Sequence, residues 1–393
     1  AHLSFLKAFP CDCEVLVVDN CSIDETATVV AGFMKEFDQI RYIKQVRNVG
    51  PERNLISVFR MAAGELIVFL ADDDLLIPDA VLSSVRYMEA NPNVVACYAP
   101  WEHWNDATKI SRGLSYVVEK KVVYEKSTSI DLFNFIIHKH VFPEVAVYRT
   151  PALHKILYLP HKAYYAFVYL AKLLDCGDIA FLPDPFYRFV EVHWEGESRE
   201  HLGYDRLMRD WDLFRGGVEC LLHKAFRNLG YAAVPAEQRD AAQKMISQFM
   251  DRRLAEAMRC LIASKDFIGA NDVFVRLLSC GAIPSAEVSY YSQLLASRAA
   301  LQSLIETVDA ITKLERIGLY CVSDLNAVTI LIKEMRPDLP ISILSDGAIN
   351  KLKNEDTMLI LAGSDQERKK LIEAGFRSGL VIVEQELVPL FMP

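Results

Sequence analysis

The 393-residue sequence lacks several features that would each place it in a known class of proteins. No apolar run approaches the ~20 residues that a membrane-spanning helix needs, and no signal peptide is recognisable. No C-x-x-C pair occurs. The nine cysteines are scattered and suggest no disulfide framework, which is typical of a protein from a reducing compartment. The formal net charge of -9 argues against a general nucleic-acid binder, which needs a basic face. We therefore expect a cytoplasmic protein that binds no nucleic acid.

The composition indicates a folded protein with substantial cores. Hydrophobic residues make up 52% of the chain and charged residues 24%. A chain of this length predicts two or three domains. The sequence opens at Ala1 within a run of helical character, LSFLKAF, so we expect the natural start to lie further upstream.

Short apolar runs and amphipathic segments alternate over the first hundred residues. The runs expected as strands are residues 14–19, 40–45, 65–70 and 94–99, and helices are expected from residue 24 to about 37, from 52 to about 63, and from 78 onward. This alternation predicts an α/β fold with a mostly parallel sheet flanked by helices.

The remaining sequence changes character twice. Residues 114–124 predict a β-hairpin or an extended edge, 129–140 a helix, 144–149 a strand, 163–177 a helix, and 178–192 a strand, a turn and a second strand. Residues 199–315 favour helices throughout and are a candidate interface for a homo-oligomer, and residues 316–393 alternate as a small Rossmann-like α/β domain. We therefore expect three domains, at 1–198, 199–315 and 316–393.

The C-terminal alternation lacks the motif that binds a dinucleotide. Its first strand-to-helix turn is CVSDLNA, whereas a dinucleotide site needs G-x-G-x-x-G so that the backbone can approach the pyrophosphate. The turn favours a structural or interaction module, and a nicotinamide-dependent reductase stays as an alternative hypothesis.

Polar loops follow the first three expected strands. They read Asp19-Asn20-Cys21-Ser22, Val46-Arg47-Asn48-Val49-Gly50 and Ala71-Asp72-Asp73-Asp74. Ligands of open parallel sheets bind at the carboxyl ends of strands, so these loops should share one site. A divalent cation, Mn²⁺ or Mg²⁺, could bridge the carboxylates to a nucleotide diphosphate, because both ions prefer hard oxygen ligands. Taken singly, each loop is equally typical of a helix cap or a solvated turn.

The order and spacing of three motifs resemble the family 2 glycosyltransferases of the GT-A fold. VVDNCSIDET at residues 17–26 is similar to V-V-D-[DN]-x-S-x-D-x-T. NVGPERN at 48–54 resembles a shortened N-x-G-x-x-x-x-R-N, and AAGELIVFLADDDLLIPD at 62–79 resembles A-x-G-E-x-[IV]-x-F-L-D-x-D-D-x-x-x-P-D. The resemblance covers about residues 1–198 and implies an enzyme that moves a sugar from a nucleotide-sugar to an acceptor with inversion.

The resemblance also implies roles for individual residues. Asp73 matches the main metal-ligating carboxylate, and Asp74 and His193 are further metal candidates. The residues implied for nucleotide binding are Asp19, Asn20, Ser22, Arg47, Asn48, Arg53 and Asp72. The implied partners are a nucleotide-sugar donor and a glycan, lipid-linked or protein acceptor, with peripheral association at the inner membrane face as an open alternative.

The sequence departs from the family pattern at three places. Ala71 stands where the leading Asp of the acidic motif is usual, and the first strand of the fold is absent ahead of the first helix. Inverting transfer needs a base for the acceptor hydroxyl, but the expected Glu-Asp pair is replaced by Tyr165-Ala166. Glu144 and His161 are the remaining candidates for the base. A glycosyltransferase-like nucleotide-binding or scaffold protein with impaired catalysis is therefore the second hypothesis.

Overall fold

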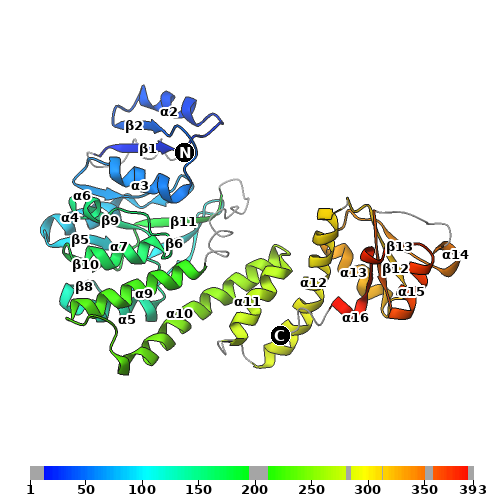
Figure 1. Cartoon of the computed structure of the whole chain (residues 1–393). Coiled ribbons are helices and arrows are strands. Elements are labelled where there is room, and N and C mark those ends of the chain that lie inside the picture. Colours follow the sequence, from blue (N-terminus) through cyan, green and yellow to red (C-terminus); the bar gives the residue numbers. More distant parts are fainter. Residues whose placement is uncertain (1–12, 194–210, 280–284, 312, 350–356, 388–393) are drawn as a thin grey trace. The chain divides into compact units, whose positions relative to one another are not determined.

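The computed structural model describes residues 13–193, 211–279, 285–311, 313–349 and 357–387. The chain forms two compact units, residues 1–249 and 250–393. Helices and strands of each unit are labelled in Figure 1. The three-domain division expected from the sequence stays a prediction.

The N-terminal unit is an α/β structure. Its strands are β1 (Val15–Asp19), β2 (Ile40–Lys44), β3 (Leu66–Val68), β4 (Leu75–Leu76), β5 (Val94–Tyr98), β6 (Trp101–Asn105), β7 (Ile110–Leu114), β8 (Val122–Tyr124), β9 (Ala146–Arg149), β10 (Asp178–Phe181) and β11 (Tyr187–Val192). Its helices are α2 (Thr26–Met34), α3 (Pro51–Met61), α4 (Pro78–Ala90), η1 (Lys126–Thr128), α5 (Ser129–Lys139), α6 (Thr150–Ile156), α7 (Tyr165–Leu173), α9 (Trp211–Asn228) and the first part of α10 (Ala236–Ala263).

The strands form three sheets, with the orders β1-β2, β3-β9-β5-β10-β8 and β4-β11-β6-β7. The predicted α/β class is confirmed, but strand directions are mixed where we expected a mostly parallel sheet. The pairs β1–β2, β5–β10 and β6–β11 are parallel, and β3–β9, β5–β9, β8–β10, β4–β11 and β6–β7 are antiparallel. The difference arises because β9, which follows α5, enters antiparallel between β3 and β5.

The β1–β2 pair is a separate small sheet (Figure 1). Within the described residues β1 pairs only with β2, and β3 pairs only with β9. The Glu14 carboxylate connects the two sheets, because it accepts the backbone N–H groups of Ala63 and Gly64 just before β3.

Of the two alternatives expected for residues 114–124, the hairpin is wrong and the extended edge fits, because β8 is the edge strand of its sheet. A hairpin instead joins β6 to β7, and β8 pairs antiparallel with β10. In the segment between β7 and β8, Tyr116 and Val118 are buried in the core.

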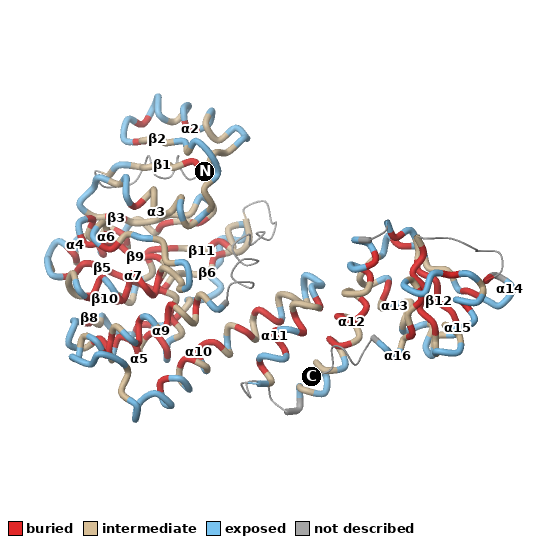
Figure 2. Tube along the Cα trace, in the orientation of Figure 1, coloured by how far each residue is buried: buried red, intermediate tan, exposed pale blue. Residues whose placement is uncertain are grey.

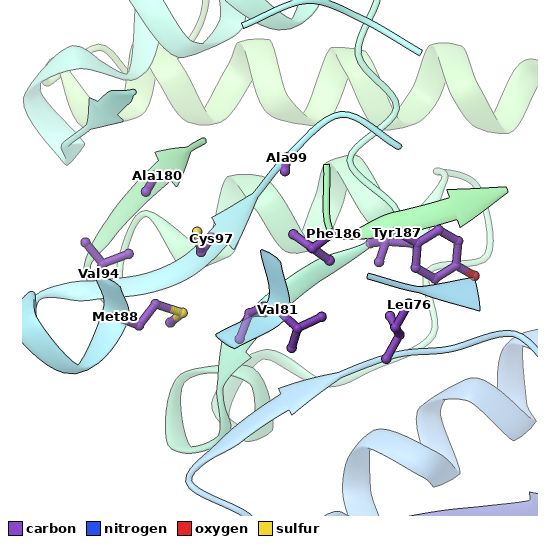
Figure 3. Close-up of a cluster of buried hydrophobic side chains, with 11 residues drawn as sticks. Leu76, Val81, Met88, Val94, Cys97, Ala99, Ala180, Phe186 and Tyr187 are labelled. Atoms are coloured by element: carbon purple, nitrogen blue, oxygen red, sulfur yellow. The ribbon is translucent and has the colours of Figure 1, made fainter. Parts of the chain in front are cut away.

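The central sheet positions the loops of interest. Every residue of β5, VVACY, is buried, as expected for a strand covered on both faces (Figure 2). Val94, Cys97 and Tyr187 belong to one apolar cluster together with Leu76 and Phe186 (Figure 3). At the end of α7, a Cβ on Gly177 would lie 2.3 Å from the Asn93 carbonyl oxygen, so only glycine allows this approach to β5.

The C-terminal unit contains the Rossmann-like sheet that the alternation predicts. After the rest of α10 its elements are α11 (Phe267–Ser279), α12 (Ser285–Ile311), β12 (Arg316–Tyr320), α13 (Leu325–Met335), β13 (Ile341–Ile343), α14 (Asp346–Ile349), β14 (Met358–Ala362), α15 (Asp365–Glu373), η2 (Ser378–Leu380), β15 (Val381–Val383) and α16 (Glu384–Leu387). The order β13-β12-β14-β15 is parallel throughout.

The turn between β12 and α13 is occupied by the unit's own side chains. Both carboxylate oxygens of Glu384 accept the Ser323 N–H at 3.1 Å, and Asp324 caps α13 through the Ala327 N–H. A pyrophosphate in this turn would have to displace the Glu384 carboxylate, because both anions would accept a hydrogen bond from the Ser323 N–H. In the part of the chain that the structure describes, no helix is long and apolar enough to cross a membrane.

Candidate nucleotide site at the carboxyl edge of the N-terminal strands

Asp19 ends β1 and organises the first loop from within. Its side chain accepts the Tyr42 hydroxyl and, at 2.7 Å, the Ser22 N–H, and Lys44 Nζ lies 3.9 Å away. Burial raises the pKa of this carboxyl, but the hydrogen bonds from Tyr42 and Ser22 outweigh burial and hold the pKa below its usual range. The same bond raises the pKa of Tyr42 to about 12. Asp19 is therefore an ionised residue that shapes the loop, and its direct contact with a nucleotide stays a prediction.

We expect Tyr42→Phe to lower the melting temperature at pH 7, with a difference from the wild type that shrinks in acid. The lowered pKa of Asp19 means that the ionised carboxylate stabilises the folded state above its unfolded pKa, and this stabilisation is lost as the pH falls through the folded pKa. Removing the Tyr42 hydroxyl removes part of that stabilisation. Melting temperatures of both proteins between pH 7 and pH 3 test this; a constant difference would contradict it.

Two asparagines join the first loop to the second. Asn20 Oδ1 accepts the Val49 N–H at 2.8 Å, and Asn20 Nδ2 donates to Asn48 Oδ1 at 3.0 Å. Asn48 Oδ1 also accepts the N–H of Gly50, whose φ of 86° favours glycine. The predicted Asn20 and Asn48 are thus brought together, and the loops after β1 and β2 form one polar surface.

The predicted arginines lie on the surface near these loops. Arg47 is exposed in the loop after β2, and Arg53 is exposed in the first turn of α3, next to Pro51 and Glu52. Exposed guanidinium groups can reach a phosphate bidentately. Their role in nucleotide binding stays a prediction.

The three carboxylates after β3 have different environments. Asp72 is exposed, Asp73 is half-buried, and Asp74 is only 4% exposed. Asp74 Oδ2 accepts the Tyr187 hydroxyl at 2.7 Å, and Oδ1 accepts the Val190 N–H at 2.9 Å. Since both oxygens of Asp74 bind β11, this geometry favours a structural role for Asp74 over the predicted metal-ligand role.

Tyr187 completes the support of the acidic loop. Its hydroxyl accepts the Ala71 N–H at 3.3 Å while donating to Asp74. Burial, with the Asp74 charge, raises the pKa of Tyr187 well above its usual range, so the phenol stays protonated and donates. The β4–β11 pair and this hydroxyl hold the loop against the sheet and leave Asp72 and Asp73 as its more accessible carboxylates.

No group of three or more His, Cys, Asp or Glu side chains comes together as a metal centre among the described residues. His193 follows β11 and is half-buried, and no described contact joins it to Asp73. The adjacent carboxylates of Asp72 and Asp73 nevertheless fit a Mg²⁺ or Mn²⁺ ion that takes its other ligands from phosphates and water. His193 as a ligand stays a prediction.

The two predicted base candidates occupy different positions. Val147 of β9 pairs with Val68 of β3, so Glu144, just before β9, lies at the same sheet edge as the acidic loop. Its carboxylate accepts the Tyr164 hydroxyl at 2.8 Å. His161 is exposed in the loop before α7. The structure thus places Glu144 near the predicted site, and the role of either residue stays a prediction.

A polar cluster that the sequence did not reveal lies on the neighbouring sheet. His103 of β6, Arg112 of β7 and Glu191 of β11 meet through side-chain contacts. The three residues are far apart in the sequence and form no motif. They meet because β6 pairs with β11 on one side and with β7 on the other.

The fold and this edge define an α/β protein whose polar and acidic loops gather at the carboxyl ends of strands. Residues 2–157 match the model of glycosyl transferase family 2. This N-terminal part of the chain is therefore a family 2 glycosyltransferase domain, as its three motifs predicted.

Similar proteins were found by sequence and by structure. The GalNAc(5)-diNAcBac-PP-undecaprenol beta-1,3-glucosyltransferase of Campylobacter jejuni is 38% identical over 71 residues, which are 18% of this chain and 23% of that protein. S. aureus TarS 1-349 in complex with UDP has 15% identity and a TM-score of 0.44, covering 78% of this chain and 82% of that chain. A mannosyltransferase from Pyrobaculum calidifontis in complex with GDP-Man and Mn2+ has 15% identity and a TM-score of 0.40, covering 79% and 81%.

Proposed function

We propose that this protein is an inverting glycosyltransferase that moves a sugar from a nucleotide-diphosphate sugar to an acceptor hydroxyl in glycan or polysaccharide synthesis. The observation that carries the proposal is the loop with Asp72 and Asp73, which follows β3 inside the segment that matches the family. The joined loops at Asn20 and Asn48 supply a polar surface for the nucleotide at neighbouring strand ends.

The residues divide into binding and positioning groups. Asn20, Ser22 and Asn48 would contact the base or ribose, and Arg47 and Arg53 would contact phosphate. Asp72 and Asp73 would hold Mn²⁺ or Mg²⁺, with His193 as a further ligand. When bound, the ion would neutralise the diphosphate as it leaves. Asp19 and Asp74 would keep the two loops in position through their hydrogen bonds.

The acceptor class follows from the sequence relative. Its name gives an undecaprenol-linked acceptor, so a lipid-linked acceptor is the first to test for this chain. Such an acceptor would bring the protein to the inner face of the membrane from the cytoplasm. Separately, the helical region at 199–315 would serve as the interface if copies of the chain form a homo-oligomer.

The alternative is a nucleotide-binding or scaffold protein of the same fold with impaired catalysis. Tyr165 and Ala166 stand where a base is expected, and this observation favours the alternative. Turnover distinguishes the two functions, because both predict nucleotide binding.

A panel of nucleoside diphosphates tests the proposed function. We expect UDP, GDP or dTDP with Mn²⁺ to raise the melting temperature, because a ligand at 100 times its dissociation constant stabilises the folded state by about 2.7 kcal/mol. Slow Mn²⁺-dependent hydrolysis of the matching nucleotide-sugar would support an enzyme over a scaffold. If none of these nucleotides changes the melting temperature with any divalent ion, the nucleotide-sugar function is wrong.

A further inference from the structure

The face of β11 that carries Glu191 also holds the acidic loop. Side chains alternate along a strand, so Tyr187 and Phe189 share one face. The register with β6 is irregular at Glu191, but its carboxylate contacts His103, the pairing partner of Phe189, and so lies on the same face. Tyr187 on this face binds Asp74, and the Val190 N–H, next to Glu191, binds Asp74 at 2.9 Å. Glu191 is therefore one residue from an amide that the acidic loop engages directly.

Glu191 orients a histidine on the adjacent strand. Its Oε1 lies 2.9 Å from His103 Nδ1, and its Oε2 accepts Arg112 Nη1 at 3.3 Å. The ring of Phe189 packs edge-on against the imidazole, with 5.9 Å between ring centroids. The imidazole is thus held on two sides by β11, and Arg112 forms an ion pair with Glu191.

This arrangement fixes which ring nitrogen is available. An ionised carboxylate only accepts hydrogen bonds, so Nδ1 of His103 carries a hydrogen and Nε2 of a neutral imidazole is a proton acceptor. Nε2 makes no hydrogen bond to any side chain or backbone group within the described residues, and the side chain is 33% exposed. A base oriented by a carboxylate, with its second nitrogen accessible, is the arrangement that general base catalysis uses.

The distance from the acidic loop suits an acceptor. His103 pairs with Phe189 of β11, and Asp74 flanks β11 on its other side. Two strand spacings of ~4.8 Å therefore separate the row of His103 from that of Asp74, about 10 Å in all. Asp72 and Asp73 precede Asp74 in the same loop, so a sugar held there by its diphosphate would lie on the side of the sheet edge that His103 neighbours.

We propose that His103 is the general base that deprotonates the acceptor hydroxyl, and that Glu191 is the residue that positions it. This inference rests on the proposed function. As the acceptor oxygen bonds to the anomeric carbon, its proton passes to His103 Nε2. The bond from that carbon to the diphosphate breaks, and its electron pair leaves with the diphosphate oxygen. Glu191 then stabilises the imidazolium.

Neighbouring charges are compatible with this role. Glu191 and Arg112 face the imidazole from β11 and β7. Glu102 and Arg188 bind each other at 2.7 Å on the opposite face of the sheet, where Arg188 also stacks on Trp104 at 3.9 Å. Glu144, the competing base, is hydrogen-bonded by Tyr164. The experiment must therefore compare His103 with Glu144.

Hydrolysis of UDP-glucose, GDP-mannose and dTDP-glucose with Mn²⁺ provides the assay, since water replaces the acceptor hydroxyl. We expect His103→Gln to lower the hydrolysis rate by about 100-fold or more, while UDP, GDP or dTDP still raises its melting temperature. Added imidazole should restore part of the rate in His103→Ala. Glu191→Gln should lower the rate, and Glu191→Asp should recover part of it. His138→Gln, at an exposed histidine of α5, is the matched control and should behave as the wild type.

The outcomes separate this proposal from the one on which it rests. A wild-type protein that binds no nucleoside diphosphate would overturn the proposed function, and the base with it. Nucleotide binding without hydrolysis in the wild type would favour the scaffold alternative and would overturn the base together with the transferase. The base alone is overturned if the wild type hydrolyses the nucleotide-sugar but His103→Gln keeps its rate while Glu144→Gln loses it, or if imidazole fails to rescue His103→Ala.

Discussion

Asp73→Asn is expected to abolish Mn²⁺-dependent binding of nucleoside diphosphates without unfolding the protein. Asp73 is half-buried in the loop after β3, next to the exposed Asp72. Replacing residues that only support a metal ligand already costs 10–100-fold in affinity, so removing a ligating charge should weaken binding by roughly 100-fold or more. Titration calorimetry with the nucleotide that most stabilises the wild type, in the presence of Mn²⁺, measures the loss.

Asp38→Asn is the matched control for this change. Asp38 is exposed in the turn before β2, so its substitution removes one negative charge from the same unit and leaves the site intact. The melting temperature without ligand should be nearly unchanged in both variants, because neither substitution changes the side-chain volume appreciably. Wild-type affinity in Asp73→Asn would show that the cation, or the nucleotide, is held elsewhere.

The sequence was most informative where local order determined the result. β1, β2, β3 and β5 occur where short apolar runs predicted strands, because these runs are bounded by polar turns and their residues are buried in β5 and mostly half-buried in the other three strands. The same order of strands and polar turns led to the prediction that the three loops share a site, and this shared site stays a prediction.

The sequence could not resolve what depends on pairing between distant strands. Three consecutive aspartates look equivalent in the sequence, yet Asp74 alone is buried, because β11 lies beside β4 more than a hundred residues later. The His103–Glu191 contact depends on the same β11 strand. The strand at residues 144–149 was predicted and occurs as β9, but its antiparallel direction was not predicted, since a strand's direction is set by its partners and not by its own residues.

Asp74→Ala is expected to lower the free energy of unfolding of the N-terminal unit by about 3 kcal/mol or more. The change leaves the buried Tyr187 hydroxyl and Val190 N–H without their carboxylate acceptor, and a hydrogen bond to a charged group contributes about 1.5–3 kcal/mol. Tyr187→Phe removes only the first of these bonds and should cost about half as much. Asp73→Asn, which removes neither, should leave stability unchanged.

Urea unfolding followed by tryptophan fluorescence measures the free energy of unfolding of the N-terminal unit. All four tryptophans, at positions 101, 104, 194 and 211, belong to the N-terminal unit. The stability order should therefore be wild type and Asp73→Asn first, then Tyr187→Phe, then Asp74→Ala. The opposite result, with Asp74→Ala as stable as the wild type but unable to bind Mn²⁺ with nucleotide, would restore Asp74 as a metal ligand. The contrast between neighbouring aspartates thus assigns one to ligand binding and the other to the fold that presents it.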